Sequence, residues 1–130
     1  MENAEYIIQF VFKNTGIRVS IFVDPDIKMV EGAAATGTDR IELYTEGYAK
    51  QYDEGRREAA IAPYIAAAEK ANELNLGINA GHDLDLQNLQ FFSRSIPGLL
   101  EVSIGHGLIC DAIYLGLENT VQLYKRQLQP

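Results

Sequence analysis

Residues 76–82 read Leu-Gly-Ile-Asn-Ala-Gly-His, and residues 99–106 read Leu-Leu-Glu-Val-Ser-Ile-Gly-His. In each stretch, a short aliphatic run is followed by glycine and then histidine. Short aliphatic and β-branched runs are typical of buried parallel strands. Two similar runs, Ile17–Val23 and Ile41–Thr45, come earlier in the chain. The sequence therefore predicts four strands, two of which end in the same Gly-His turn.

Segments with helical spacing lie between these strands. Asp24 and Pro25 open the first, with Asp24 as its expected N-cap, and Gly37 is suited to end it. The longest segment covers about residues 54–75, and Pro63 is expected to kink or restart it. Further helices are predicted over residues 3–14, from residue 85, and over residues 106–128 with a break at Gly116. Alternating strands and helices predict an α/β fold with a parallel sheet and helical crossovers.

The strands alternate between apolar and polar residues. One face is predicted to carry Val19, Ile21, Val23, Ile41, Leu43, Ile78, Ala80, Leu100, Val102 and Ile104. The other face is predicted to carry Arg18, Ser20, Arg40, Glu42, Tyr44, Asn79, Glu101 and Ser103. A sheet covered by helices on both sides would be apolar on both faces, whereas a barrel wall can be polar inside. Four such strands predict half of an eight-stranded barrel with its helices outside.

Composition limits the possible classes of protein. A chain of 130 residues with 47% hydrophobic side chains is expected to form one domain over residues 1–130. The net charge of −7 argues against a nucleic-acid surface. No segment resembles a membrane span or a secretory leader, and the single cysteine fits a reducing compartment, so a cytoplasmic location is expected. One cysteine and two histidines make a structural zinc site unexpected.

The two Gly-His turns are the strongest candidates for a functional site. Glycine permits close approach of a ligand to the backbone, and the helix that follows presents free N–H groups. On neighbouring strands, Gly81-His82 and Gly105-His106 would form an anion cradle, where loops of barrel enzymes commonly bind phosphate. Either histidine could act as a general acid or bind the phosphate. The alternative is that both histidines only cap their strands through backbone hydrogen bonds.

Other residues allow two interpretations. Glu42 is expected on the polar face, where it would handle protons or stabilise positive charge, or else pair with Arg18 or Arg40. Cys110 lies in an apolar helical stretch, which predicts a packed, inert thiol. Tyr44, Tyr48 and Tyr52 could close over a ligand, although loop packing is the simpler interpretation.

Four motifs in order resemble one enzyme family. They are Gly16-Ile-Arg-Val-Ser-Ile-Phe-Val-Asp24, Arg40-Ile-Glu-Leu-Tyr-Thr45, Asn79-Ala-Gly-His82 and Ser103-Ile-Gly-His-Gly-Leu-Ile-Cys110. Together they are similar to the C-terminal half of pyridoxine 5′-phosphate synthase, which acts in vitamin B6 biosynthesis. The resemblance covers essentially the whole chain and implies half of a TIM barrel from an octameric enzyme.

The resemblance also implies an activity and roles for particular residues. The family condenses 3-amino-2-oxopropyl phosphate with 1-deoxy-D-xylulose 5-phosphate, releasing phosphate and water, without a metal or organic cofactor. By position, His82 matches the family's proton donor, and Glu42 matches the glutamate credited with transition-state stabilisation. Gly105 and His106 match the phosphate-binding turn. Asp83 occupies a binding position that is glycine in many members.

The resemblance further implies that much of the active site comes from elsewhere. The family's first four strands carry an Asp-His pair, substrate-binding arginines, and a histidine and a glutamate that act as bases, and none has a counterpart here. The expected partners are therefore phosphorylated substrates, inorganic phosphate, and either a complementary N-terminal half or further copies of this chain, with no nucleic acid or membrane. The chain alone is expected to be inactive. The alternatives are a non-catalytic phosphate-binding half-barrel and an open α/β interaction domain.

Overall fold

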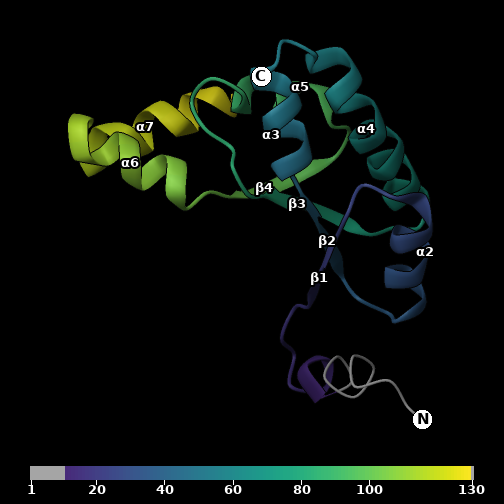
Figure 1. The fold of residues 1–130 in the computed structure, drawn as a ribbon. Coiled ribbons are helices and arrows are strands. Elements are labelled where there is room, and N and C mark those ends of the chain that lie inside the picture. The colour runs from purple at the N-terminus through teal and green to yellow at the C-terminus, as the bar shows by residue number, and fades with distance from the viewer. Residues whose placement is uncertain (1–10, 130) are drawn as a thin grey trace.

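The computed structural model describes residues 11–129, in which four parallel strands form one sheet (Figure 1). The strands are β1 (Ser20–Val23), β2 (Arg40–Tyr44), β3 (Gly77–Gly81) and β4 (Leu99–Ser103). They lie in the order β1-β2-β3-β4, with each strand parallel to its neighbours. Sequential parallel strands with helical crossovers are the repeating unit of a TIM barrel. The predicted α/β half-barrel is confirmed.

Six helices with assigned bounds accompany the strands in the described part of the chain. They are α2 (Ile27–Ala35), α3 (Glu46–Asp53), α4 (Arg57–Glu73), α5 (Leu89–Ser95), α6 (His106–Leu115) and α7 (Leu117–Gln127). Residues 11–14 are also helical, as predicted, whereas residues 3–10 of that predicted helix lie outside the described residues. The predicted break at Gly116 is confirmed, because α6 ends and α7 begins there. Of the kink or restart predicted at Pro63, the restart is absent, since α4 continues through it.

The N-cap of α2 is Asp26 and not Asp24. The Asp26 carboxylate accepts a hydrogen bond from the Met29 backbone N–H at 3.1 Å, which satisfies one of the unpaired donors of the first turn. The backbone N–H of Asp26 in turn donates to the Asp24 carbonyl at 2.7 Å. The predicted cap at Asp24 is wrong: proline suits the first position of a helix, but α2 begins only at Ile27, two residues after Pro25.

The two faces of the sheet differ as the alternation predicts. Ile41, Leu43, Ile78 and Ala80 are fully buried on the apolar face. Helices α2, α4 and α5 supply the side chains that complete this core, among them Val30, Ala33, Ala60, Ala67, Ala68, Ala71, Leu89 and Phe92. Small alanines on α4 allow that helix to approach the sheet closely, which explains how such a short chain forms a continuous core.

A charged network on the polar face joins the amino ends of β1 and β2 to the middle of β3 and β4. Both Arg18, before β1, and Arg40, on β2, lie within 3.2 Å of the Glu101 carboxylate on β4. Arg40 also donates to the side-chain oxygen of Asn79 at 2.9 Å. Arg18 and Glu101 belong to opposite edges of the sheet, so their side chains meet above the polar face. A β-carbon at Gly77 would lie 2.7 Å from Cγ of Arg40, so glycine leaves the space that Arg40 crosses.

The predicted alternation is wrong at one position of β4. Ile78 pairs with Leu99, but the next residue of β3, Asn79, pairs with Glu101. Leu100 is therefore the extra residue of a β-bulge and is 57% exposed, while Leu99 takes the predicted position on the apolar face. Single-sequence alternation cannot reveal this shift, because two adjacent leucines fit either register.

Tyr48 belongs to the core and does not form a lid. Tyr48 lies on α3, a helix that the sequence did not predict, and it is fully buried. Its ring packs against Tyr64 at a centroid distance of 6.0 Å and against Phe92 at 4.9 Å. Its hydroxyl donates to the Asn88 carbonyl at 2.7 Å, so the polar end of the ring is also satisfied. Tyr48 therefore joins α3, α4 and the start of α5.

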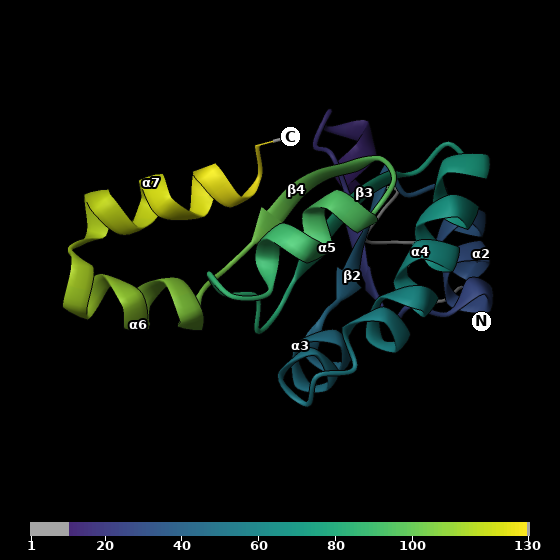
Figure 2. The ribbon, with the colours of Figure 1, turned by 90° about the horizontal axis from the view of Figure 1, so that it is seen from above.

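Helices α6 and α7 form a hairpin that extends away from the rest of the chain (Figures 1 and 2). No residue of α6 is buried, and Ile113 and Tyr114 are 76% and 88% exposed. Cys110 on the same helix is exposed, so the prediction of a packed thiol is wrong. Although α7 packs against α6, no other described element covers the face that carries Ile109, Ile113 and Tyr114. Among residues 11–129, no helix is long and apolar enough to cross a membrane.

Replacement of Phe92 tests the aromatic core. We expect Phe92→Ala to lower the free energy of unfolding by about 3–5 kcal/mol, because the fully buried ring leaves a cavity among α3, α4 and α5. The matched control is Phe22→Ala, at a ring that is 53% exposed, with an expected loss of at most about 1 kcal/mol. Urea unfolding followed by circular dichroism measures both, and equal losses would contradict this assignment of the core.

Candidate functional site

The register of the sheet brings the two Gly-His turns to one end. Gly81 on β3 pairs with Ser103 on β4, so the turns that follow begin at the same level on neighbouring strands. The first turn of α6 also packs on the β3–α5 loop. A β-carbon at Gly107 would lie 2.9 Å from the Leu84 carbonyl oxygen, and only glycine permits this approach without a shift. The predicted proximity of the turns is thus present in the fold.

Glu42 lies beside the first of these turns. A β-carbon at Gly81 would lie 2.7 Å from Oε1 of Glu42, which means that the carboxylate extends across the glycine. The alternative of an ion pair with Arg18 or Arg40 is wrong, because both arginines contact Glu101 instead. Glu42 forms no ion pair with any residue in the described range 11–129. No positively charged side chain among these residues therefore neutralises the Glu42 carboxylate.

His82 and Asp83 share an unusual backbone conformation directly after β3. Their φ angles are 99° and 56°, in the left-handed region that non-glycine residues rarely adopt. This conformation gives a physical reason for glycine to suit the position of Asp83. Nδ1 of His82 lies 3.1 Å from the Asp83 carboxylate, and the imidazole packs edge-on against the ring of Tyr44, with centroids 4.7 Å apart. The side chains of His82 and Asp83 are each about half exposed.

Thr45 connects the end of β2 to this turn. Its backbone N–H donates to the Gly81 carbonyl at 3.1 Å, and its hydroxyl donates to the His82 carbonyl. The Tyr64 hydroxyl donates to the Tyr44 carbonyl at 2.9 Å, which anchors the same segment to α4. The sequence predicts no role for Thr45. Its position directly after a predicted strand is the only feature that could indicate a role in the site.

The second turn begins a helix. Gly105 is the N-cap of α6, and its carbonyl accepts from the Ile109 N–H at 3.1 Å. No side chain caps this helix start, and His106 is the exposed first residue of the helix. The N–H groups of the first turn have no partners within the helix, so they are suited to bind an anion.

Tyr44 has an acidic neighbour that changes its titration. Its hydroxyl donates to the Glu46 carboxylate, at the start of α3. This hydrogen bond raises the pKa of Tyr44 to about 12, because ionisation would lose the donor and place two negative charges together. Tyr44 therefore stays a neutral hydrogen-bond donor at physiological pH.

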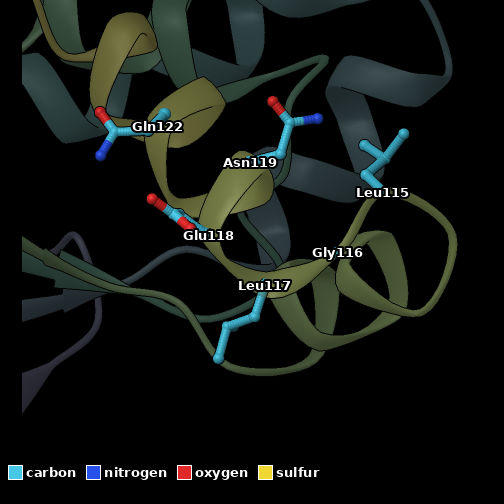
Figure 3. A pocket seen from close by; sticks show the side chains of 6 residues that line it. All are labelled: Leu115, Gly116, Leu117, Glu118, Asn119 and Gln122. Atoms are coloured by element: carbon cyan, nitrogen blue, oxygen red, sulfur yellow. The ribbon is translucent and has the colours of Figure 1, made fainter.

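Two hollows are lined by described residues, one near the candidate site and one farther along the chain. One, of about 360 Å³, lies beside Tyr44 and is lined by Asp24, Pro25, Tyr44, Glu46, Gly47, Lys50, Gln51, Pro63 and Tyr64. The other, of about 480 Å³, lies at the α6–α7 turn and is shown in Figure 3, lined by Leu115, Gly116, Leu117, Glu118, Asn119 and Gln122. Within residues 11–129, no three histidine, cysteine, aspartate or glutamate side chains group closely enough to hold a metal ion.

Comparison with known proteins identifies the family. The sequence matches the family described as pyridoxal phosphate biosynthesis protein PdxJ over residues 2–130. The chain belongs to this family. It is 60% identical to the pyridoxine 5′-phosphate synthase of Flavobacterium johnsoniae over 131 residues, which cover 99% of this chain and 55% of that protein. It is 64% identical to the synthase of Cytophaga hutchinsonii over 118 residues, 91% of this chain and 49% of that protein. The chain thus spans about half the length of these PdxJ relatives.

Replacement of Gly81 tests the packing of Glu42. We expect Gly81→Ala to lower the free energy of unfolding by about 1–3 kcal/mol, because its methyl group would lie 2.7 Å from both the Glu42 carboxylate and the Ser103 carbonyl. The control is Gly32→Ala, inside α2, where a β-carbon meets nothing within 4 Å and alanine suits a helix better than glycine, so no loss is expected. Chemical denaturation compares the two, and a neutral Gly81→Ala would contradict the close packing of Glu42 and Ser103 around Gly81.

Proposed function

We propose that this chain forms the phosphate-binding and proton-donating half of a pyridoxine 5′-phosphate synthase active site. The complete site would condense 3-amino-2-oxopropyl phosphate with 1-deoxy-D-xylulose 5-phosphate. The observation that carries this proposal is the grouping of Glu42, Gly81 and His82 at the end of β3, level with the Gly105-His106 turn. Enzymes with this fold bind substrate at the carboxyl ends of their strands, where these residues lie.

The two turns supply complementary chemistry. The uncapped start of α6 offers N–H groups and the positive end of a helix dipole to a phosphate, with His106 beside it. His82 would donate a proton to a leaving oxygen during ring closure, because a positioned imidazole is a common general acid in enzymes. Glu42, which no described cation neutralises, would stabilise positive charge that develops on a nitrogen of the reacting substrates.

Asp83 restricts how phosphate could bind at the first turn. A carboxylate facing a phosphate would repel it, but the Asp83 carboxylate lies 3.1 Å from Nδ1 of His82 instead. Contact between substrate and this position would therefore use the backbone N–H of Asp83. The side chain would remain on the imidazole.

The rest of the site would come from a second polypeptide segment. Strands β1 and β4 are the edges of the sheet, and each pairs with one neighbour. Phe22 on β1 is 53% exposed, and Leu100 on β4 is 57% exposed. Unpaired strand edges favour pairing with further strands. The proposed occupant is the N-terminal half of the family's barrel, which would also carry the catalytic bases. A second copy of this chain could pair with the same edges but would not bring those bases.

Phosphate binding can be measured on this chain alone. In a titration with inorganic phosphate, we expect the largest amide ¹H–¹⁵N shifts at Gly105, His106 and Gly107, because their N–H groups face the proposed anion. Sulfate should produce the same pattern, whereas chloride at equal ionic strength should not. Shifts confined to other segments would contradict the proposed phosphate site.

Synthase activity is expected only after reconstitution. The chain alone should form no pyridoxine 5′-phosphate from the two substrates, because bases that contribute a factor of about 10² to 10⁴ each would be missing. Addition of the N-terminal half of the Flavobacterium johnsoniae synthase should restore turnover and give a complex larger than either part by light scattering. His82→Gln should then reduce kcat by a factor of about 10² to 10⁴.

The controls separate the alternatives. Tyr114→Leu alters an exposed residue of α6 remote from the proposed chemistry and should leave turnover unchanged. Phosphate binding without turnover in a confirmed complex would favour the non-catalytic phosphate-binding module. Product formation by the chain alone, lost in His82→Gln, would contradict the requirement for a second half.

A further inference from the structure

We propose that Tyr44 and Asp83 are positioning residues that together fix the orientation of the His82 imidazole, so that its Nε2 faces the substrate. This inference rests on the proposed function of His82 as a proton donor. It adds a role for two side chains that flank the donor, one on the neighbouring strand and one next in sequence.

The need for such positioning follows from the surroundings of His82. Its side chain is about half exposed and stands on a backbone with φ of 99°. The Thr45 hydroxyl and N–H hold the backbone of this turn through the carbonyls of His82 and Gly81, but they do not touch the imidazole. A half-exposed imidazole held only by its backbone would populate several rotamers. Proton transfer requires one geometry, so a second set of contacts is needed.

Tyr44 supplies the contact to the ring. Its centroid lies 4.7 Å from that of His82 in an edge-to-face arrangement, which is a favourable geometry for two aromatic rings. Tyr44 is itself held at three points. Its hydroxyl donates to Glu46, its carbonyl accepts from Tyr64, and Phe22 packs on its ring at 5.4 Å. A ring fixed in this way is a rigid support for the imidazole.

Asp83 determines which nitrogen remains available. Its carboxylate lies 3.1 Å from Nδ1 of His82, and because a carboxylate is an acceptor, this proximity favours the tautomer with the proton on Nδ1. Nε2 is then the nitrogen left to exchange a proton with the substrate. A carboxylate on one ring nitrogen commonly fixes the tautomer and direction of a functional histidine in this way.

The imidazole signals of the chain alone test this orientation without any need for activity. The chain has two histidines, so His106→Gln leaves one imidazole and assigns it to His82. We expect nuclear Overhauser contacts between the Tyr44 and His82 rings, and ¹⁵N shifts at neutral imidazole that show protonated Nδ1. Tyr44→Leu should abolish the ring-current displacement of the His82 protons, and Tyr44→Phe should retain it. Asp83→Gly should shift the tautomer toward protonated Nε2, while Tyr114→Leu should change none of these signals.

Kinetics of the reconstituted enzyme give a second readout. Tyr44→Leu and Asp83→Gly should each lower kcat by roughly tenfold, part of the factor that a positioned acid contributes, with little change in KM. Tyr44→Phe should restore most of the loss. A role in folding alone would instead lower the unfolding midpoint and leave the kcat of the folded fraction unchanged.

The two measurements fail independently. Unchanged His82 signals in both Tyr44→Leu and Asp83→Gly would overturn the positioning role, even if the reconstituted enzyme were active. Altered His82 signals in a complex that never turns over would retain the positioning role and contradict the proposed function instead.

Discussion

The pairing of β2 with β3 is the constraint on which the core and the candidate site both depend. In this register Ile41 lies beside Ile78 and Leu43 beside Ala80 on the buried face. The intervening pairs, Glu42 with Asn79 and Tyr44 with Gly81, lie on the polar face. A slip of one residue would move every one of these side chains to the opposite face. The hydrophobic core therefore holds Glu42 and Tyr44 beside the Gly-His turn, although neither residue contributes to that core.

The central strands could be predicted from the sequence because apolar residues recur at every second position. On β2 the burial alternates strictly, and on β3 Ile78 and Ala80 continue the buried face, although Asn79 is buried as well. The prediction failed where burial depends on something that alternation does not encode. At Leu100 a bulge shifts the register, and at Cys110 the helix packs against α7 but leaves the thiol exposed. The helix α3 was missed because it is short and polar, apart from the buried Tyr48 and Ala49.

The candidate site, too, could be predicted from the sequence only in part. Glycine followed by histidine at two strand ends is visible in the sequence, and so is a glutamate on a polar face. The contacts that hold these groups are not visible. Thr45 reaches the His82 carbonyl across 37 positions of sequence, and Tyr44 contacts an imidazole 38 positions away. Only the register of the sheet specifies such pairs, because sequence spacing alone does not determine which strand ends meet.

Glu42, Asn79 and Glu101 lie level with one another across β2, β3 and β4, but the two carboxylates have different neighbours. Glu101 contacts Arg18 and Arg40, and Arg40 also contacts Asn79, so these groups satisfy one another. Glu42 extends toward Gly81 instead and has no cationic partner among the described residues, and His82 and Asp83 after β3 are half exposed. Charges that neutralise one another are poor ligand-binding groups, because a ligand must first displace the existing partner. By occupying both arginines, Glu101 leaves the Glu42 carboxylate available at the end of the sheet where the Gly-His turns lie.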